Sequence, residues 1–100
     1  MTKRCYNSGP ISTKSWDDAY HAFRESDELI STCLHMKPVN PLTTWALPRH
    51  APWICHMIKD IMLMLTCSAV FFQKDWEQSK GARVEFNFAR ALGMRVIFEQ

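Results

Sequence analysis

The feature that most constrains this chain is a regular alternation of short strand-like segments with longer helix-like ones. The strand-like segments are residues 3–8, 37–41, 68–72 and 95–98, and the helix-like segments are residues 15–36, 53–66 and 79–92. Strands that are separated by helical crossovers pair in parallel, with right-handed connections. The sequence therefore predicts an α/β fold with a parallel sheet of about four strands and three helices.

Local signals support the helix boundaries. Ser15 can cap the first helix, and Asp17 and Asp18 follow where the positive end of a helix favours acids. Pro52 suits the first turn of the second helix. Gly93 is expected to end the third helix.

Two segments are unusually apolar. Residues 68–72 show no alternation of polar and apolar side chains, which predicts a strand covered on both faces. Residues 53–66 are apolar on most sides except at His56, Lys59 and Asp60, so we expect that helix to be buried on most sides, by another subunit if necessary. A minimal sheet with exposed edges also favours a homo-oligomer, either a dimer or a tetramer.

The composition excludes several classes of protein. A chain of 100 residues predicts one domain, residues 1–100, and a net charge of +2 without a basic stripe gives little support for binding a nucleic acid polymer. Residues 1–6 contain no apolar run typical of a signal peptide, and residues 54–72 are too polar to span a membrane. We therefore expect a cytoplasmic protein whose partner is a small molecule.

A metal site has little support in the sequence. The four cysteines and four histidines form no CxxC or HxxxH spacing. Cys55, His56 and His50 could gather around a metal, but buried thiols and scattered histidines are the favoured interpretation.

Ligands bind to open parallel sheets at the carboxyl ends of the strands. Three segments reach that edge in the predicted fold, namely residues 8–13, 40–41 and 75–81. Gly9 and Gly81 would let a ligand approach the backbone, and a helix amino terminus after residue 79 favours an anion. Taken alone, these segments are explained more simply as tight turns and a helix cap.

Glu85 is the most informative acid of the chain. On a helix it shares a face with Gly81, one turn away, so its carboxylate could reach into space left over the strand ends. A carboxylate placed there can attack an electrophilic carbon or stabilise an oxocarbenium-like centre. The alternative is a surface acid that is stabilised by the helix dipole or pairs with Arg83 or Arg90.

These residues carry a resemblance to a known family. "YNSGPIS" at residues 6–12, "NP" at residues 40–41, the helix around Asp60 and "WEQSKGARVEFNFARALG" at residues 76–93 resemble a family of short bacterial and phage proteins of unknown function. That family is related to the nucleoside 2-deoxyribosyltransferases and the 2'-deoxynucleoside 5'-phosphate N-hydrolases. The resemblance covers nearly the whole chain and implies a three-layer α/β/α fold, flavodoxin-like or Rossmann-like.

The resemblance also implies an activity: cleavage of an N-glycosidic bond in a deoxynucleoside or deoxynucleotide by transfer or hydrolysis, without a metal or organic cofactor. Glu85 would be the nucleophile, and a base could stack on a loop tryptophan such as Trp45 or Trp76. The residues expected to bind substrate are Ser8, Gly9, Pro10, Ser12, Asn40, Trp76, Ser79 and Gly81.

The chain departs from the pattern of the transferases at specific positions. Ser68 and Ser79 stand where the transferases carry acids that help to handle the proton of the departing base, although Asp60 or Asp75 could substitute. Asn7 replaces an apolar strand residue, so we expect the first strand to be distorted. Two alternatives therefore stay open beside the enzyme: a non-catalytic nucleotide-binding module and a purely structural protein.

Overall fold

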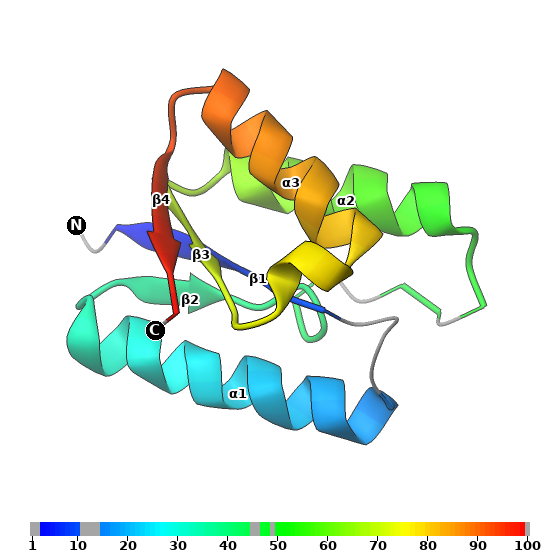
Figure 1. Cartoon of the computed structure of the whole chain (residues 1–100), viewed down its shortest axis with the longest axis horizontal. Coiled ribbons are helices and arrows are strands. Elements are labelled where there is room, and N and C mark those ends of the chain that lie inside the picture. The colour runs from blue at the N-terminus through cyan, green and yellow to red at the C-terminus, as the bar shows by residue number, and fades with distance from the viewer. Residues whose placement is uncertain (1–2, 11–14, 45–46, 49, 100) are drawn as a thin grey trace.

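The computed structural model describes residues 3–10, 15–44, 47–48 and 50–99. Its strands are β1 (Arg4–Ser8), β2 (Lys37–Val39), β3 (Ala69–Phe72) and β4 (Arg95–Phe98). Its helices are α1 (Trp16–Cys33), α2 (Trp53–Leu65) and α3 (Lys80–Ala91), and the short 3₁₀ helix η1 (Trp76–Gln78) precedes α3. Figure 1 shows these elements in three layers, with the sheet in the middle.

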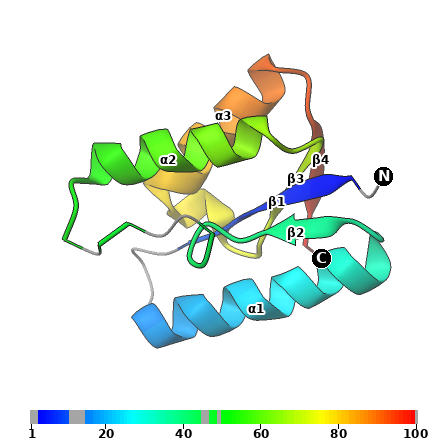
Figure 2. The same ribbon diagram turned by 180° about the vertical axis from the view of Figure 1, so that it is seen from behind.

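All pairings in the sheet are parallel, and the strand order is β2-β1-β3-β4. The order reverses direction between β1 and β3, because the chain first moves outward to β2 and then returns across β1. Right-handed crossovers therefore place α1 on one face and α2 with α3 on the other, as Figures 1 and 2 show. The predicted three-layer α/β/α architecture, with four parallel strands and three helices, is confirmed.

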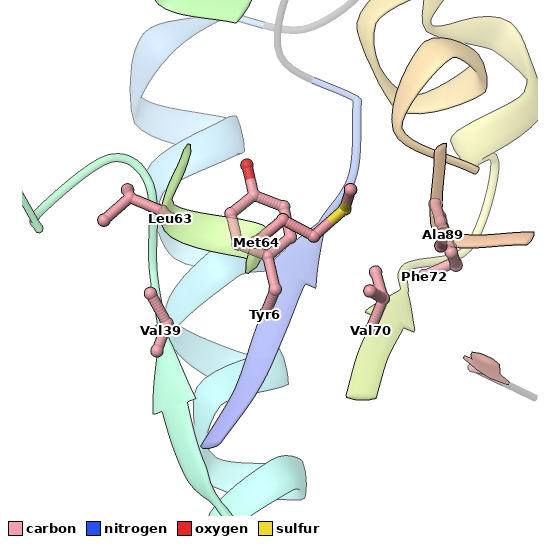
Figure 3. Close-up of a cluster of buried hydrophobic side chains, with 7 residues drawn as sticks. All are labelled: Tyr6, Val39, Leu63, Met64, Val70, Phe72 and Ala89. Carbon is pink, nitrogen blue, oxygen red and sulfur yellow. The ribbon is translucent and has the colours of Figure 1, made fainter. Parts of the chain in front are cut away.

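Each face of the sheet has its own apolar cluster, because successive side chains of a strand point to opposite faces. Under α2 and α3 the buried cluster is Tyr6, Val39, Leu63, Met64, Val70, Phe72 and Ala89 (Figure 3). Under α1 it is Cys5, Ile30, Met36, Ala69 and Phe71. All four residues of β3 are buried, which confirms the prediction of a strand covered on both faces.

The helix caps follow the local signals. The Ser15 hydroxyl accepts a hydrogen bond from the Asp18 amide at 3.2 Å. At the end of α3, Gly93 takes a left-handed φ of 70°, and its amide donates to the Arg90 carbonyl at 3.1 Å. The next amide, of Met94, reaches back to a carbonyl of the last turn, as in a Schellman motif.

Some predicted boundaries are wrong by one to three residues. Helix α1 ends at Cys33 rather than at residue 36, because His35 adopts a left-handed φ of 54° that breaks the helix. Strand β2 ends at Val39, before the turn at Asn40. Pro52 lies at the N-cap of α2, one position before the first turn.

The expected distortion at Asn7 is also wrong. Asn7 keeps its place in the parallel ladder opposite Phe71, and its side chain points toward α1. Its amide nitrogen donates to the Phe23 carbonyl and the Asp27 carboxylate, while its amide oxygen accepts from Gln73 at 2.9 Å. These partners satisfy the buried amide, so the strand stays regular.

Helix α2 carries an exposed apolar face in this chain. Four side chains spaced three or four residues apart each expose about half of their surface: Ile54, Ile58, Met62 and Leu65. Trp53, the first residue of the same helix, is 46% exposed as well. Among the described residues, no helix is both long and apolar enough to cross a membrane.

Candidate functional site

Glu85 lies inside the molecule, with 4% of its surface exposed. The Tyr6 hydroxyl donates to one carboxylate oxygen at 2.7 Å, and the Ser8 hydroxyl donates to the other at 2.6 Å. The alternative of a surface acid paired with Arg83 or Arg90 is therefore wrong. Two hydroxyl donors fix the orientation of the carboxyl group.

The strand period explains why these two donors meet one acid. Tyr6 and Ser8 are two residues apart on β1, so both side chains face α2 and α3 near the carboxyl end of the strand. Glu85 is reached on the second turn of α3, whose start is set by Ser79 as N-cap. The Ser79 hydroxyl accepts from the Ala82 amide at 3.3 Å.

The environment disfavours a charge on Glu85. Burial and, to a lesser extent, the nearby charge of Asp60 raise the pKa of its carboxyl group to about 8, against the lowering effect of the Ser8 and Tyr6 hydrogen bonds and of the Lys59 charge. Asp60 is also buried, and burial raises its pKa, while the charge of Lys59 opposes the rise. The charge of Asp60 acts on Glu85, and carboxyl groups that interact in this way release their protons as a pair.

A buried lysine completes the group. The Lys59 ammonium lies 3.0 Å from Oδ1 of Asp60 as an ion pair, and it donates a hydrogen bond to the Pro41 carbonyl at 2.8 Å. Oδ1 of Asp60 accepts no well-aligned hydrogen bond from the described residues. This buried oxygen therefore keeps hydrogen-bonding capacity that its ion pair with Lys59 leaves unused.

Tyr6 stays a donor throughout the neutral range. Burial raises the pKa of its phenol well above its ordinary value, and the charges of Glu85 and Asp60 raise it further. Its ring is part of the apolar cluster under α2, where Figure 3 shows its hydroxyl directed toward the carboxyl end of β1. A rigid ring with a protonated hydroxyl holds the carboxyl group in one position.

Gly81 has a different role from the expected one. The space beside it is occupied by α2, because a Cβ at this position would lie 3.2 Å from Sδ of Met57. The small residue allows Met57 of α2 to approach α3 closely, and the Met57 side chain lies in the space beside the glycine. Glu85 reaches Ser8 without using that space.

The other predicted binding residues fall into three places. Gly9 and Pro10 are buried directly after β1, where the Gln73 side chain lies so close to Gly9 that a Cβ would be 2.4 Å from it. Asn40 is occupied by structural contacts, since it donates to Asp27 at 3.0 Å and accepts from the Leu42 amide at 2.8 Å. Ser12 and Trp45 lie outside the described residues.

Trp76 belongs to an aromatic cluster at the end of β3. Its ring centroid lies 5.0 Å from that of Phe72, 4.8 Å from Phe86 and 5.8 Å from Phe98. Packing against three rings explains its position. The ring is only partly exposed, and base stacking on it stays a prediction.

Ser68, one of the departures from the transferase pattern, lies away from Glu85 in the fold. Ser68 is exposed at the amino end of β3, where its hydroxyl donates to the Arg4 carbonyl at 3.2 Å. Residue 68 therefore lies at the edge of the sheet opposite Glu85, so an acid is not missing from the site there. Of the two acids that could substitute, Asp75 is exposed, in a left-handed turn, whereas Asp60 lies close enough for its charge to act on Glu85.

Sequence reasoning missed Tyr6 and Lys59 as members of the site. Tyr6 could have been found from the two-residue spacing to Ser8 on a predicted strand. Lys59 stands out as a charge on an apolar helix, but its partner Pro41 follows a different strand. Among the described residues no group of three acids, histidines or cysteines could hold a metal.

Comparison with known proteins gives a family and a fold. The family described as a domain of unknown function (DUF4406) matches residues 3–98. A solved structure described as a 2-desoxiribosyltransferase from Leishmania mexicana is similar, with a TM-score of 0.66 and 22% identity, over 96% of this chain and 63% of that one. The chain thus spans less than two thirds of that protein, and the likeness shows a common fold. No curated protein matches the chain.

Proposed function

Because the chain belongs to the family of domains of unknown function DUF4406, we propose its activity from the site itself: cleavage of the N-glycosidic bond of a deoxynucleoside or deoxynucleotide. The observation that carries this proposal is the buried Glu85 carboxyl group, held by the hydroxyls of Tyr6 and Ser8 beside a second acid, Asp60. The 2-desoxiribosyltransferase that shares the fold supports the same class of substrate.

Two carboxyl groups that share one proton supply both halves of such a reaction. Glu85, as the carboxylate, would attack the anomeric carbon, and the bond from that carbon to the base nitrogen would break with its electron pair on the base. The proton that Glu85 holds in the resting pair would pass to Asp60, the partner of Lys59, as substrate binds, and Asp60 would give it to the departing base. Water or a second base would then release the sugar from Glu85.

The anionic end of a nucleotide has a candidate place at the start of α3. The Ser79 hydroxyl accepts from the Ala82 amide and keeps its own proton to donate. The free amides of the first turn favour negative charge at the same point. We therefore include Ser79 as an anion-binding residue of the proposal, together with the Gly9–Pro10 turn near the sugar.

A base-release assay tests the proposal. The chain is incubated with each deoxynucleoside and each deoxynucleoside monophosphate, and free base is measured by chromatography. We expect release from at least one substrate, and Glu85→Gln should lower the rate at least about 100-fold because it removes the nucleophile. Glu77→Gln is the matched control, since Glu77 is exposed at the same edge of the sheet.

The two remaining alternatives give different results in this assay. Tight binding of a nucleotide without base release from the wild-type chain would identify a non-catalytic nucleotide-binding module. If the chain neither binds a nucleotide nor releases base, the result would favour a structural protein. An equal loss in Glu77→Gln and Glu85→Gln would contradict the role of Glu85.

We also propose that the chain forms a homo-oligomer. The exposed apolar face of α2, made of Ile54, Ile58, Met62 and Leu65, supports association with a second copy. The cytoplasmic location expected from the sequence stays a prediction.

A further inference from the structure

Lys59 is a buried cation that the proposed reaction does not use. Only 5% of its surface is exposed, and its ammonium makes two contacts, with the Pro41 carbonyl at 2.8 Å and with Oδ1 of Asp60 at 3.0 Å. A buried ammonium loses most of its hydration, which disfavours burial of any ion. A lysine on the surface would avoid this cost. The burial of Lys59 is therefore explained by the groups with which its ammonium interacts.

Lys59 lies on the part of α2 that faces α3, near the two buried acids. Sδ of Met57 lies against Gly81, so this part of α2 faces the start of α3. Two and three residues further along α2, Lys59 and Asp60 lie close enough to Glu85 for their charges to act on it. The charge of Lys59 lowers the pKa of both carboxyl groups, whereas burial raises both.

The charged and titratable groups around this pair come from three elements. Helix α2 brings His56 and Lys59 to Asp60, strand β1 brings Tyr6 to Glu85, and α3 brings Glu85 itself. Of these groups, Lys59 is the one that forms an ion pair, with Asp60, and its charge also acts on Glu85. If both acids were protonated, the lysine would be buried without a counter-ion.

We propose that Lys59 is a positioning residue that balances one negative charge shared by Asp60 and Glu85, so that this buried pair holds a single proton through the neutral range. Its hydrogen bond to Pro41 fixes the ammonium at the end of β2. The value of this charge balance for catalysis rests on the proposed function, because the singly protonated pair supplies both the carboxylate and the acid. The charge balance itself does not depend on turnover.

The test is a carboxyl-carbon NMR titration of Glu85 and Asp60. In Lys59→Met, which keeps the apolar stem and removes the charge, the first ionisation of the pair should move to higher pH by about one unit or more. Lys37→Met is the control, because Lys37 is exposed at the opposite end of β2. Unchanged titration curves in Lys59→Met would overturn the proposal.

A second variant decides the matter if Lys59→Met does not fold. Asp60→Asn keeps the shape of the side chain and leaves Lys59 without its anion. Glu85 should then become the counter-ion of Lys59, and the pKa of its carboxyl group should fall by about one unit or more. A Glu85 titration identical to that of the wild type would show that Asp60 carries no charge beside it, and would overturn the proposal.

Base release separates this proposal from the proposed function. If the wild-type chain releases base, its rate should fall off on the acidic side of a pH–rate profile. In Lys59→Met the midpoint of that acidic limb should move to higher pH by the same amount as the NMR titration. A shifted titration in a chain that releases no base would support the charge balance and contradict the enzyme. A loss of rate in Lys59→Met without any shift of the limb would indicate a merely structural lysine.

Discussion

At the scale of single residues, the environment of Glu85 combines features that are costly for stability. Its carboxyl group is buried beside Asp60, and the hydroxyls of Tyr6 and Ser8 together with the charge of Lys59 offset part of the loss of water. A surface acid would keep its ordinary pKa, whereas this one is held near 8. Perturbed acids of this kind are concentrated at functional sites, since their protonation state can change near neutral pH.

The raised pKa of Glu85 predicts how stability depends on pH. The folded chain binds the proton more tightly than the unfolded chain does, so this contribution is complete below the ordinary pKa of 4.5 and is lost as the pH rises through about 8. Each unit of pKa shift corresponds to about 1.4 kcal/mol. Between pH 5 and pH 9 the wild type should lose this contribution to its free energy of unfolding. Glu85→Gln has no ionisable group there, so its free energy of unfolding should rise relative to that of the wild type over the same range.

Urea denaturation at a series of pH values measures this difference. Glu77→Gln, at an exposed position, should follow the wild type at every pH. A constant difference between Glu85→Gln and the wild type across the range would contradict the raised pKa.

At the scale of elements, the start of α3 connects local sequence to the site. Ser79 caps the helix, Gly81 allows the close approach of Met57, and Glu85 follows one turn later. The orientation of Glu85 therefore depends on where the helix begins. The same segment that resembles a family motif is also a well-formed helix start, which explains why the helix was predictable from the sequence.

Ser79→Ala should weaken the start of α3. Loss of the cap removes the hydrogen bond to the Ala82 amide, and the free energy of unfolding should fall by about 1 kcal/mol. Ser31→Ala is a suitable control, because Ser31 is exposed within α1 and alanine favours a helix. Chemical denaturation measures both variants, and equal stability of Ser79→Ala and the wild type would show that the cap is unimportant.

At the scale of the whole molecule, the sheet has unequal cover on its two faces. Helices α2 and α3 cover one face of the sheet, and Glu85 points from α3 toward that face. Helix α1 alone covers the other face (Figure 2). On the α1 face, Asn7, Asp27, Asn40 and Gln73 form a network of hydrogen bonds that joins three strands to the helix. This polar network holds the carboxyl ends of the strands together, beneath the proposed site.

The exposed face of α2 predicts self-association. Ile58→Lys places a charge in the middle of the apolar face at a position that is already 55% exposed, so it should disrupt an oligomer without unfolding the chain. Analytical ultracentrifugation should show the wild type as an oligomer and Ile58→Lys as a smaller species. Ser31→Lys, on α1, is the control, and a monomeric wild type across the accessible concentrations would contradict the prediction.

The sequence by itself determined the order of elements, the parallel sheet and the caps at Ser15 and Gly93, because these depend on periodicity and on contacts within a few residues. It also indicated Glu85, through its spacing from Gly81, although Met57 fills the space that was expected beside that glycine. The exact ends of α1 and β2 were less predictable, since backbone turns at His35 and Asn40 decide them.

Only the tertiary structure decided which groups meet at Glu85. Tyr6 and Ser8 are 79 and 77 residues away in sequence, and parallel pairing of β1 and β3 together with the crossover of α3 brings them into contact. The same packing buries Lys59 and Asp60 beside the acid and removes the water that would keep its pKa ordinary. No local pattern encodes that exclusion of water, because it arises from segments that touch only when the whole chain has folded.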